Sequence, residues 1–443
     1  MRKKLRVAVG VVTAFAALSL AACGGGSSGN GANGSKGGAA QGAEQGAAPA
    51  AAPKQPVPAA FDNTKGWEIR DDEHDLSGPV ISDEAGLVLL RWHERGGKTA
   101  RVVARDAKTG KVRWSSKPVV RPEAPKSGMP VDSKVLLARG GSKEYAVLAV
   151  TGSEGGDGVN TASPVTRLAV YDIASSGDDV KPQREITVPG PALGFTAQRE
   201  LGVVKVASDQ GVSLVDVVSG QVTTYDRNHA LKSPKPCQQL IGTCDNSRVT
   251  VAGQTPVGPL VQGYGAFWAG GWFSGDVVPA GAVPERGGRR VTASGLPNGD
   301  ALASWPDKEG KGQTNVYAVH DGKTGLVRAS VACANESDSA FTPTVSGDGR
   351  YVLAGRVVID LQSGQGQCFE QTSTRNAITV ATVDKAGTAY GKTSQSPASV
   401  DLSSGHASPL PWGTLLPTAI GADVAVFGTS TAGGESILVY PRR

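Results

Sequence analysis

The fold of this 443-residue chain is decided by a short stretch that reads Val102-Val103-Ala104-Arg105-Asp106-Ala107-Lys108-Thr109-Gly110-Lys111-Val112-Arg113-Trp114. Apolar and β-branched residues lie on both sides of its centre, and such residues favour β-strands. Asp106 opens a turn, because its carboxylate can accept hydrogen bonds from the backbone N–H groups just ahead. Gly110 closes the turn, because the returning chain needs a positive φ or a bulge there. The stretch therefore predicts a β-hairpin.

The same order of strand, Asp, small hydroxyl residue, Gly and strand recurs along the chain. Its further copies are centred on Asp172, Asp216, Asp321, Asp360 and Asp401. The last three are about 40 residues apart, and a period of roughly 40–50 residues made only of strands is typical of four-stranded propeller blades. The interval from Asp216 to Asp321 is about twice as long, so we expect one degenerate copy within it. These repeats predict an all-β fold, namely a β-propeller.

The number of blades follows from the two ends of the repeat region. The last unit, residues 419–440, contains only three recognisable strands, whereas residues 66–70 form a strand that has no partner of its own. Placing residues 66–70 in the last blade closes the ring and removes an exposed sheet edge. We therefore predict eight four-stranded blades closed by this N-terminal strand. Seven blades are the alternative, if the degenerate copy is not a whole blade.

The first 22 residues have the layout of a secretory signal. A basic head at residues 2–6 is followed by an uncharged, mostly apolar run at residues 7–20 and by small residues before Cys23. The run is shorter than the roughly 20 residues that a transmembrane helix needs. Leu20-Ala21-Ala22-Cys23 resembles the bacterial lipobox, which implies cleavage before Cys23 and attachment of fatty acyl chains such as palmitate to it. An ordinary signal peptide with an incidental Cys is the alternative.

The segment after Cys23 differs in composition from the rest of the chain. Residues 24–60 are dominated by Gly, Ala, Ser, Gln and Pro and contain no aromatic residue, so they cannot bury enough apolar surface to fold. The sequence therefore predicts three parts: a signal peptide (1–22), a lipidated Cys with a disordered tether (23–60) and a propeller (61–443). This order places the protein on the extracytoplasmic face of the cell membrane, held through its lipid.

Charge argues against nucleic acid as a partner. The formal net charge is +5, and the head of the signal supplies four of those positive charges, so the mature chain is nearly neutral. No stripe of Lys and Arg interleaved with aromatic residues is evident, although recognition of nucleic acid depends on such a basic surface.

The cysteines of the mature chain predict disulfides. Besides Cys23, the chain contains Cys237, Cys244, Cys333 and Cys368. An even number in an exported protein favours disulfides, and four Cys allow three pairings. We favour Cys237–Cys244, a short local loop, and Cys333–Cys368, which follow the turns of neighbouring blades at similar distances. A zinc site is the alternative, but the sequence has no Cys-x-x-Cys pair and no His at ligand spacing.

Residues 103–114 resemble the repeat of PQQ-like β-propellers, in which a strand, an Asp-x-x-Thr-Gly turn and a following Trp recur. The resemblance is fair at Asp216 and Asp321 and covers most of residues 65–443 as a repeat type. The family includes quinone-dependent dehydrogenases and non-enzymatic lipoproteins of the BamB-like assembly-scaffold type. The order of lipobox, tether and propeller is similar to the second group, which implies a scaffold. The adjacent Cys pair of many quinoproteins is absent from this sequence.

No recognisable catalytic constellation occurs in the sequence. The five His residues are far apart, and no nucleophile elbow or phosphate loop is present. His320 directly precedes a turn Asp, so we expect it on the surface of a blade. We therefore predict no catalytic residue, no metal ligand and no cofactor.

One stretch is unusually aromatic. Aromatic residues make up 5% of the chain, but residues 263–275 contain Tyr264, Phe267, Trp268, Trp272 and Phe273. Aromatic side chains among Gly residues suit contact with a partner or a carbohydrate, which makes these five residues the candidate binding patch. The alternative is packing between blades in the irregular unit.

Together these features predict a monomeric, membrane-anchored lipoprotein whose propeller binds an extracytoplasmic protein or a small ligand and performs no catalysis. The competing hypothesis is an extracytoplasmic propeller enzyme, such as a quinoprotein dehydrogenase or a hydrolase. Clustered Asp and His residues at a channel mouth would favour the enzyme.

Overall fold

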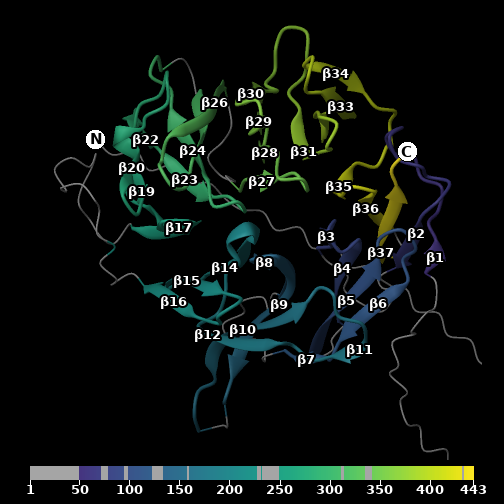
Figure 1. Cartoon of the computed structure of the whole chain (residues 1–443). Coiled ribbons are helices and arrows are strands. Elements are labelled where there is room, and N and C mark those ends of the chain that lie inside the picture. The colour runs from purple at the N-terminus through teal and green to yellow at the C-terminus, as the bar shows by residue number, and fades with distance from the viewer. Residues whose placement is uncertain are drawn as a thin grey trace, which may run out of the picture. The chain divides into compact units, whose positions relative to one another are not determined.

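A computed structural model describes residues 49–70, 78–93, 98–121, 133–156, 159–226, 231, 249–310, 314–334, 342–431 and 434–443. Almost all regular structure in these ranges is β-strand (Figure 1). The helical segments among them are two 3-10 turns, η1 (Arg199–Leu201) and η4 (Ser274–Asp276). The predicted all-β fold is confirmed. In the same ranges, no helix has the length and apolar character needed to cross a membrane.

The first half of the described chain builds four units, each with four antiparallel strands, which we number I to IV. Two short strands extend the sheet of unit I: β7 (Val119–Val120) pairs antiparallel with its third strand, and β11 (Gly177–Val180) pairs parallel with its fourth. They comprise β3 (Val80–Ser82), β4 (Leu87–Trp92), β5 (Thr99–Asp106) and β6 (Val112–Ser116) in unit I; β8 (Ser133–Gly140), β9 (Lys143–Glu154), β10 (Ser163–Asp172) and β12 (Arg184–Pro189) in unit II; β13 (Gly194–Gln198), β14 (Val203–Ala207), β15 (Gly211–Asp216) and β16 (Val222–Asp226) in unit III; and β17 (Thr250–Thr255), β18 (Gly258–Gln262), β19 (Phe267–Ala269) and β20 (Trp272–Phe273) in unit IV.

The second half builds units V to VIII in the same way. They comprise β23 (Thr292–Gly295), β24 (Ala301–Pro306), β25 (Asn315–His320) and β26 (Val327–Cys333) in unit V; β27 (Thr344–Val345), β28 (Tyr351–Ala354), β29 (Val357–Asp360) and β30 (Gln365–Cys368) in unit VI; β31 (Thr379–Val383), β32 (Thr388–Lys392), β33 (Pro397–Asp401) and β34 (His406–Pro409) in unit VII; and β35 (Pro417–Ile420), β36 (Val424–Thr431), β37 (Gly434–Pro441) and β2 (Trp67–Arg70) in unit VIII. Units V and VI are joined by a parallel bridge between Ser330 and Gln365.

Burial along the strands explains why they pair in this order. The middle strands β24 and β25 bury every residue, because each of their faces packs on another unit. The outer strand β12 instead alternates exposed and buried residues over most of its length, as a half-buried strand should. The units are therefore packed face to face, and the fourth strand of unit II borders solvent on one side.

Each unit shares a buried apolar cluster with the next unit along the chain. Such clusters join I to II, II to III, III to IV, IV to V, V to VI, VI to VII and VII to VIII. A further cluster, which includes Trp67 and Leu90, joins VIII to I. Burial of apolar surface contributes roughly 25 cal/mol per Å². These clusters, rather than hydrogen bonds within single sheets, hold the units together.

Unit IV is the degenerate copy that the sequence placed between Asp216 and Asp321. Its third and fourth strands, β19 and β20, are only three and two residues long. The turn between them is Gly270-Gly271, with Gly271 at φ 88°, and it contains no Asp. The unit therefore keeps four strands while it loses the Asp turn that made the other copies recognisable.

Unit VIII combines strands from opposite ends of the described chain. β2 pairs antiparallel with β37, and Trp67 lies opposite Val439 while Arg70 lies opposite Ser436. This pairing confirms the prediction that residues 66–70 supply the fourth strand of the last unit. It also satisfies backbone groups that the edge of β37 would otherwise expose.

The folded part of the chain begins earlier than predicted. β1 (Ala50–Ala51) pairs antiparallel with β2. Further along the segment, the side chain of Phe61 is only 1% exposed. Its ring centroid lies 5.8 Å from that of Tyr390 and 5.4 Å from that of Phe427. Residues 49–61 therefore form a docked segment on units VII and VIII.

The predicted disordered tether, residues 23–60, is accordingly wrong for residues 49–60. The composition of this segment is misleading, because its few apolar side chains pack on units VII and VIII and its carbonyl groups find donors. The Pro56 carbonyl, for example, accepts the Leu415 N–H at 2.8 Å. The signal peptide (1–22), Cys23 and the rest of the tether lie outside the described residues.

Candidate functional site

The repeated Asp residues hold the turns between the third and fourth strands. Asp106 accepts a hydrogen bond from the Thr109 N–H at 2.9 Å, and Gly110 closes the turn at φ 68°. Equivalent backbone hydrogen bonds are accepted by Asp172, Asp216, Asp321, Asp360 and Asp401. At Asp401, hydrogen bonds from the hydroxyl and the N–H of Ser403 lower the pKa of the carboxyl. These carboxylates have the structural role that the repeat predicted.

Three Trp side chains fasten the fourth strand of one unit to the Asp turn of the next. Each indole N–H donates to the carbonyl of the residue that directly follows the turn Asp. The bonds run from Trp67 to Ala107 (3.0 Å), from Trp114 to Ile173 (3.1 Å) and from Trp272 to Gly322 (3.1 Å). One geometry therefore recurs at the VIII–I, I–II and IV–V interfaces.

The other units have a different residue at this position of the fourth strand. Trp114 pairs with Ala104, two residues before the turn Asp. The same register holds Arg184 in unit II, Thr223 in unit III, Ala329 in unit V, Gln367 in unit VI and Ser408 in unit VII. The contact made at this position decides how each interface is sealed.

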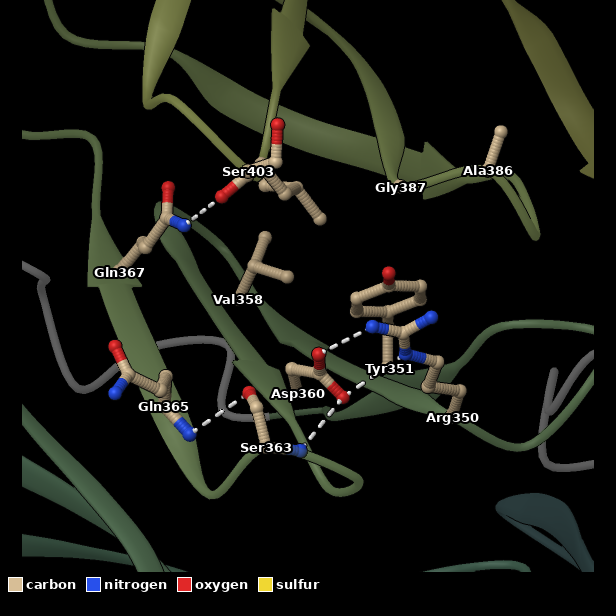
Figure 2. Close-up of a pocket in the computed structure, with 11 residues that line it drawn as sticks. Arg350, Tyr351, Val358, Asp360, Ser363, Gln365, Gln367, Ala386, Gly387 and Ser403 are labelled. Atoms are coloured by element: carbon tan, nitrogen blue, oxygen red, sulfur yellow. Dashed lines mark hydrogen bonds and ion pairs between the residues drawn. The ribbon is translucent and has the colours of Figure 1, made fainter.

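Gln367 replaces the indole only in part. Its amide N–H donates to the carbonyl of Leu402, the residue after Asp401, so it makes the hydrogen bond that a Trp makes elsewhere. Because Gln is smaller than Trp, the space beside this bond stays open. A cleft of 340 Å³ lies there, between units VI and VII (Figure 2). This cleft is the candidate functional site.

The cleft has an apolar floor and polar walls. Val358 and Leu402 are 2% and 8% exposed, and Tyr351 is 2% exposed, so these side chains form the fixed base. Gln365 and Arg350 stand on the wall contributed by unit VI. Binding sites for small groups combine an apolar base with a few placed polar groups in this way, and their volumes begin at roughly 300 Å³.

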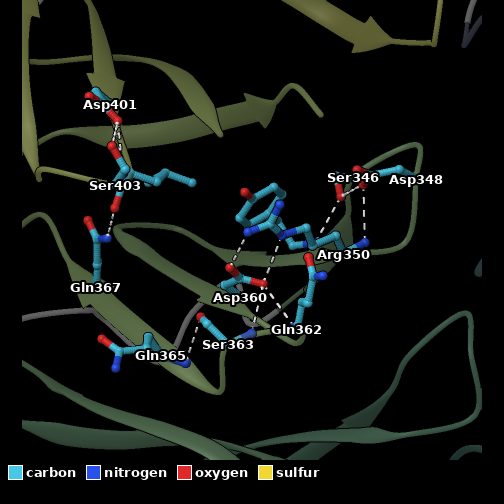
Figure 3. A network of polar contacts seen from close by, with 12 residues as sticks. Ser346, Asp348, Arg350, Asp360, Gln362, Ser363, Gln365, Gln367, Asp401 and Ser403 are labelled. Atoms are coloured by element: carbon cyan, nitrogen blue, oxygen red, sulfur yellow. Dashed lines mark hydrogen bonds and ion pairs between the residues drawn. The ribbon is translucent and has the colours of Figure 1, made fainter. Parts of the chain in front are cut away.

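The charges of the cleft neutralise each other (Figure 3). Arg350 donates from Nε and Nη2 to the two carboxylate oxygens of Asp360, at 3.0 and 2.7 Å. This bidentate pair lowers the pKa of the Asp360 carboxyl to about 2. The backbone N–H groups of Gln362 and Ser363 donate to the same carboxylate. The wall therefore carries no uncompensated charge.

A larger hollow of 480 Å³ lies between units I and II and includes Val120, which is 63% exposed. Its charged side chains do not converge, since Lys117 and Glu185 are exposed and Arg167 is paired with Glu154 at 2.8 Å. At this interface Trp114 already covers the neighbouring turn. The VI–VII cleft is the better site, because its polar groups are held in place.

The predicted binding patch is not an exposed surface. Its side chains Phe267, Trp268, Trp272 and Phe273 are 0, 5, 7 and 6% exposed. Phe267 and Trp272 pack towards unit V, whereas Trp268 and Phe273 lie in a separate cluster with Val261. Tyr264 is half-buried, with the guanidinium of Arg290 3.7 Å from its ring centroid. Phe267 and Trp272 therefore form packing between units, which was the alternative that the sequence left open, whereas Trp268 and Phe273 pack beside Val261 of their own unit.

His320 is fully buried, contrary to the expectation that it lies on a blade surface. Its Nε2 lies 3.3 Å from the indole nitrogen of Trp305, and its Nδ1 lies 2.8 Å from the Gly325 carbonyl oxygen. An indole N–H can only donate, so Nε2 accepts and Nδ1 carries the proton. Burial lowers the pKa of His320 from 6.5 to about 4. His320 is a neutral, structural residue of unit V.

One disulfide lies among the described residues. Cys333 at the end of β26 is bonded to Cys368 at the end of β30, with 5.4 Å between their Cα atoms. Glu370 lies close to these two sulfur atoms, but they are bonded to each other and offer no thiolate to a metal. The other favoured pair, Cys237 and Cys244, lies outside the described residues, as does Cys23.

Sequence reasoning missed the cleft. A signal for it was present, because the copy centred on Asp360 has Gln367 where the copy centred on Asp106 has Trp114. Recognising it required knowing that this Trp reaches across to another unit, which depends on packing rather than on the repeat itself.

No protein-family model and no curated protein matches the chain. Among similar solved structures, Porphyromonas gingivalis dipeptidyl peptidase 4 aligns with a TM-score of 0.46 at 11% identity, over 82% of this chain and 57% of its own. The extracellular domain of BT4673 from B. thetaiotaomicron aligns at 0.37 and 11%, over 86% and 40%. The dihydro-heme d1 dehydrogenase NirN aligns at 0.36 and 14%, over 77% and 58%. The chain thus spans 40–58% of these three proteins, and scores this low assign neither family nor activity.

Proposed function

We propose that the chain is an exported lipoprotein, acylated at Cys23, whose units I to VIII close into an eight-bladed β-propeller of PQQ-like type. In this proposal the propeller is a binding scaffold on the extracytoplasmic face of the membrane and performs no catalysis. The cleft between units VI and VII is its binding site.

The cleft carries the proposal. Its walls are fixed by the Arg350–Asp360 pair and its base by Tyr351, Val358 and Leu402, so it is preformed. A preformed site loses little conformational entropy when it is occupied. The two charged side chains that line it, Arg350 and Asp360, are bonded to each other rather than poised to transfer a proton, which favours binding over chemistry.

Two observations support closure into a propeller. The apolar clusters run from each unit to the next and return from unit VIII to unit I. The Trp67 indole at the VIII–I interface makes the same hydrogen bond as Trp114 at the I–II interface. Closure would lower the free energy of the fold, because it leaves no apolar face of a unit exposed to solvent.

The membrane anchor is supported by the sequence alone, through the signal and the lipobox ending at Cys23. The docked segment begins at residue 49, so residues 24–48 would link the lipid to the propeller. Fatty acid labelling of cells that express Cys23→Ser tests this part. We expect the variant to lose incorporation of a labelled fatty acid, and a variant that still incorporates the label at the wild-type level would contradict the anchor.

The binding site is tested by photo-crosslinking from the full chain in intact cells. A photoreactive residue at position 365, on the lip of the cleft, should form an adduct. The matched control is position 326, which follows the turn Gly of unit V as residue 365 follows that of unit VI and is 61% exposed. Adducts in equal amounts from both positions, or from neither, would contradict the cleft as the site.

A further inference from the structure

The VI–VII cleft lies where an indole lies at other interfaces. Gln367 pairs with Val358, two residues before the turn Asp, just as Trp114 pairs with Ala104. The carbonyl that Gln367 reaches, that of Leu402, is also the counterpart of the carbonyls that the Trp residues reach. The cleft is therefore the vacant counterpart of a site that the chain fills with Trp three times.

The space around the turn glycines differs between the interfaces that contain a Trp and the VI–VII interface. At Gly110 and Gly325, an added Cβ would lie 2.6 and 2.7 Å from ring atoms of Trp67 and Trp272, so an indole covers each turn closely. At Gly405, the corresponding glycine of unit VII, the nearest atom to an added Cβ is Oε1 of Gln367, at 3.9 Å. The surface that an indole covers elsewhere is open at the VI–VII interface.

The chemistry of the cleft suits an indole. The Leu402 carbonyl oxygen has two lone pairs, so it can accept an indole N–H in addition to the Gln367 amide. The guanidinium of Arg350 already lies 4.8 Å from the ring centroid of Tyr351, and guanidinium planes also attract the faces of other aromatic rings. Because Arg350 and Asp360 neutralise each other, a charged ligand would find no unpaired opposite charge here.

We propose that the cleft receives the indole ring of a Trp side chain from a protein partner. The ring lies against the turn of residues 402–405, and its N–H donates to the Leu402 carbonyl. This inference rests on the proposed function and specifies the residue of the partner that anchors it. Buried Trp side chains that fill a pocket are frequent energetic centres of protein interfaces.

The first test uses the mature chain with Cys23→Ser and a simple probe, N-acetyl-tryptophan amide labelled with fluorine. We expect a saturable change of the fluorine NMR signal, whereas capped leucine amide and glucose should not compete with it. A photoreactive analogue of the same probe should label residues of the cleft. No saturable change up to the solubility limit, equal competition by capped leucine or glucose, or labels elsewhere would each overturn the proposal.

The second test fills the cleft from within. Gln367→Trp places an indole at the register of Trp114 and should weaken binding of the probe at least tenfold while the protein remains folded. Thr223→Trp is the matched control, because it introduces the same side chain at the same register of unit III and leaves the cleft open. Unchanged binding in Gln367→Trp would overturn the proposal. The photolabelling result needs no variant, so it decides the matter even if Gln367→Trp does not fold.

The two proposals can fail separately. If position 365 forms adducts in cells but the Trp probe does not bind the purified protein, the binding scaffold is supported and the indole proposal is rejected. Absence of both would reject the cleft itself.

Discussion

At the scale of single residues, the interfaces between units depend on side chains that combine apolar area with one directed hydrogen bond. Trp114 is fully buried, and its indole N–H also satisfies the Ile173 carbonyl. A buried carbonyl that loses its partner costs about 1–3 kcal/mol. The indole therefore fixes the distance between two units as well as their contact.

Trp114→Phe should lower the free energy of unfolding by about 1–2 kcal/mol, because it keeps most of the apolar contact but leaves the Ile173 carbonyl without its donor. Trp114→Ala should lower it by about 3–5 kcal/mol. Urea unfolding followed by circular dichroism measures both. Trp412→Phe is the control, since this side chain is 84% exposed and should change stability by less than about 0.5 kcal/mol. Equal losses for the two Phe variants would contradict the role of the indole.

His320 makes stability depend on pH. The pKa of its imidazole falls from 6.5 in the unfolded chain to about 4 in the folded one. Below pH 6.5 the unfolded state takes up a proton that the folded state refuses, so stability falls as the pH decreases and levels off below about pH 4. Each pH unit costs about 1.4 kcal/mol, which sums to about 3 kcal/mol.

The His320 contribution is isolated by comparison with His320→Gln, whose side chain does not titrate. We expect the difference in unfolding free energy between the two proteins to shrink as the pH decreases from 6.5 to 4. Carboxyl groups titrate in both proteins and cancel. Parallel pH profiles would show that His320 is not buried in the neutral form.

At the scale of elements, two contacts link parts of the chain that lie in different units. The docked segment, residues 49–61, covers units VII and VIII through Phe61. The Cys333–Cys368 disulfide ties the fourth strand of unit V to that of unit VI, where Ala329 stands in place of a Trp. Each contact lies at an interface, V–VI or VII–VIII, where the fourth strand has Ala329 or Ser408 in place of a Trp.

Phe61→Ala should lower the free energy of unfolding by about 3–5 kcal/mol, because it leaves a cavity beside Tyr390 and Phe427. Urea unfolding of the variant and of the wild-type protein, compared side by side, measures the loss. Lys65→Ala is the control, since its side chain is 75% exposed and its ion pair with Asp62 is a surface contact that adds little to stability. A loss no greater than that of the control would mean that residues 49–61 only rest on the surface.

The double variant Cys333→Ser/Cys368→Ser should be less stable by about 4 kcal/mol, since the bond closes a loop of 35 residues in the unfolded chain. Reduction of the wild-type protein should give a loss of similar size in the same urea titration. Unchanged stability in both experiments would contradict a stabilising role for the bond.

At the scale of the whole molecule, neighbouring units pack against each other in the same way, but different side chains fill the interfaces between them. Trp seals three of them, Arg184 covers the Gly220 turn at II–III, a disulfide ties V to VI, and Gln367 leaves VI–VII partly open. Of these six interfaces, VI–VII is the one at which the side chain in the Trp position leaves a cleft beside its hydrogen bond.

The proposed closure of the eight units into a ring predicts a pattern of hydrogen exchange. Backbone amides of units I and VIII should exchange as slowly as those of III and IV, because in a closed ring no unit is terminal. Trp67→Ala should speed exchange in I and VIII and leave III and IV unchanged. Faster exchange of I and VIII in the wild-type protein would indicate an open array with frayed ends.

Much of this architecture could be predicted from the sequence, because the Asp turns are local. Asp106 and Gly110 act within one hairpin, and β2 was identifiable since residues 66–70 lacked any nearby strand to pair with. The positions of Phe267 and His320 could not be predicted, because their burial depends on a neighbouring unit. The cleft could not be predicted for the same reason, since the role of Gln367 depends on its hydrogen bond to Leu402 of the next unit.

The docking of residues 49–61 also determines how a mechanical load enters the domain. A pull on the chain before residue 49 passes through β1 into β2, which is bonded to β37 from Trp67 to Arg70. Tension along the strand axis loads these hydrogen bonds together, in shear, rather than one after another. If the chain is anchored through Cys23 as proposed, a load from the anchor would reach the sheet through these bonds.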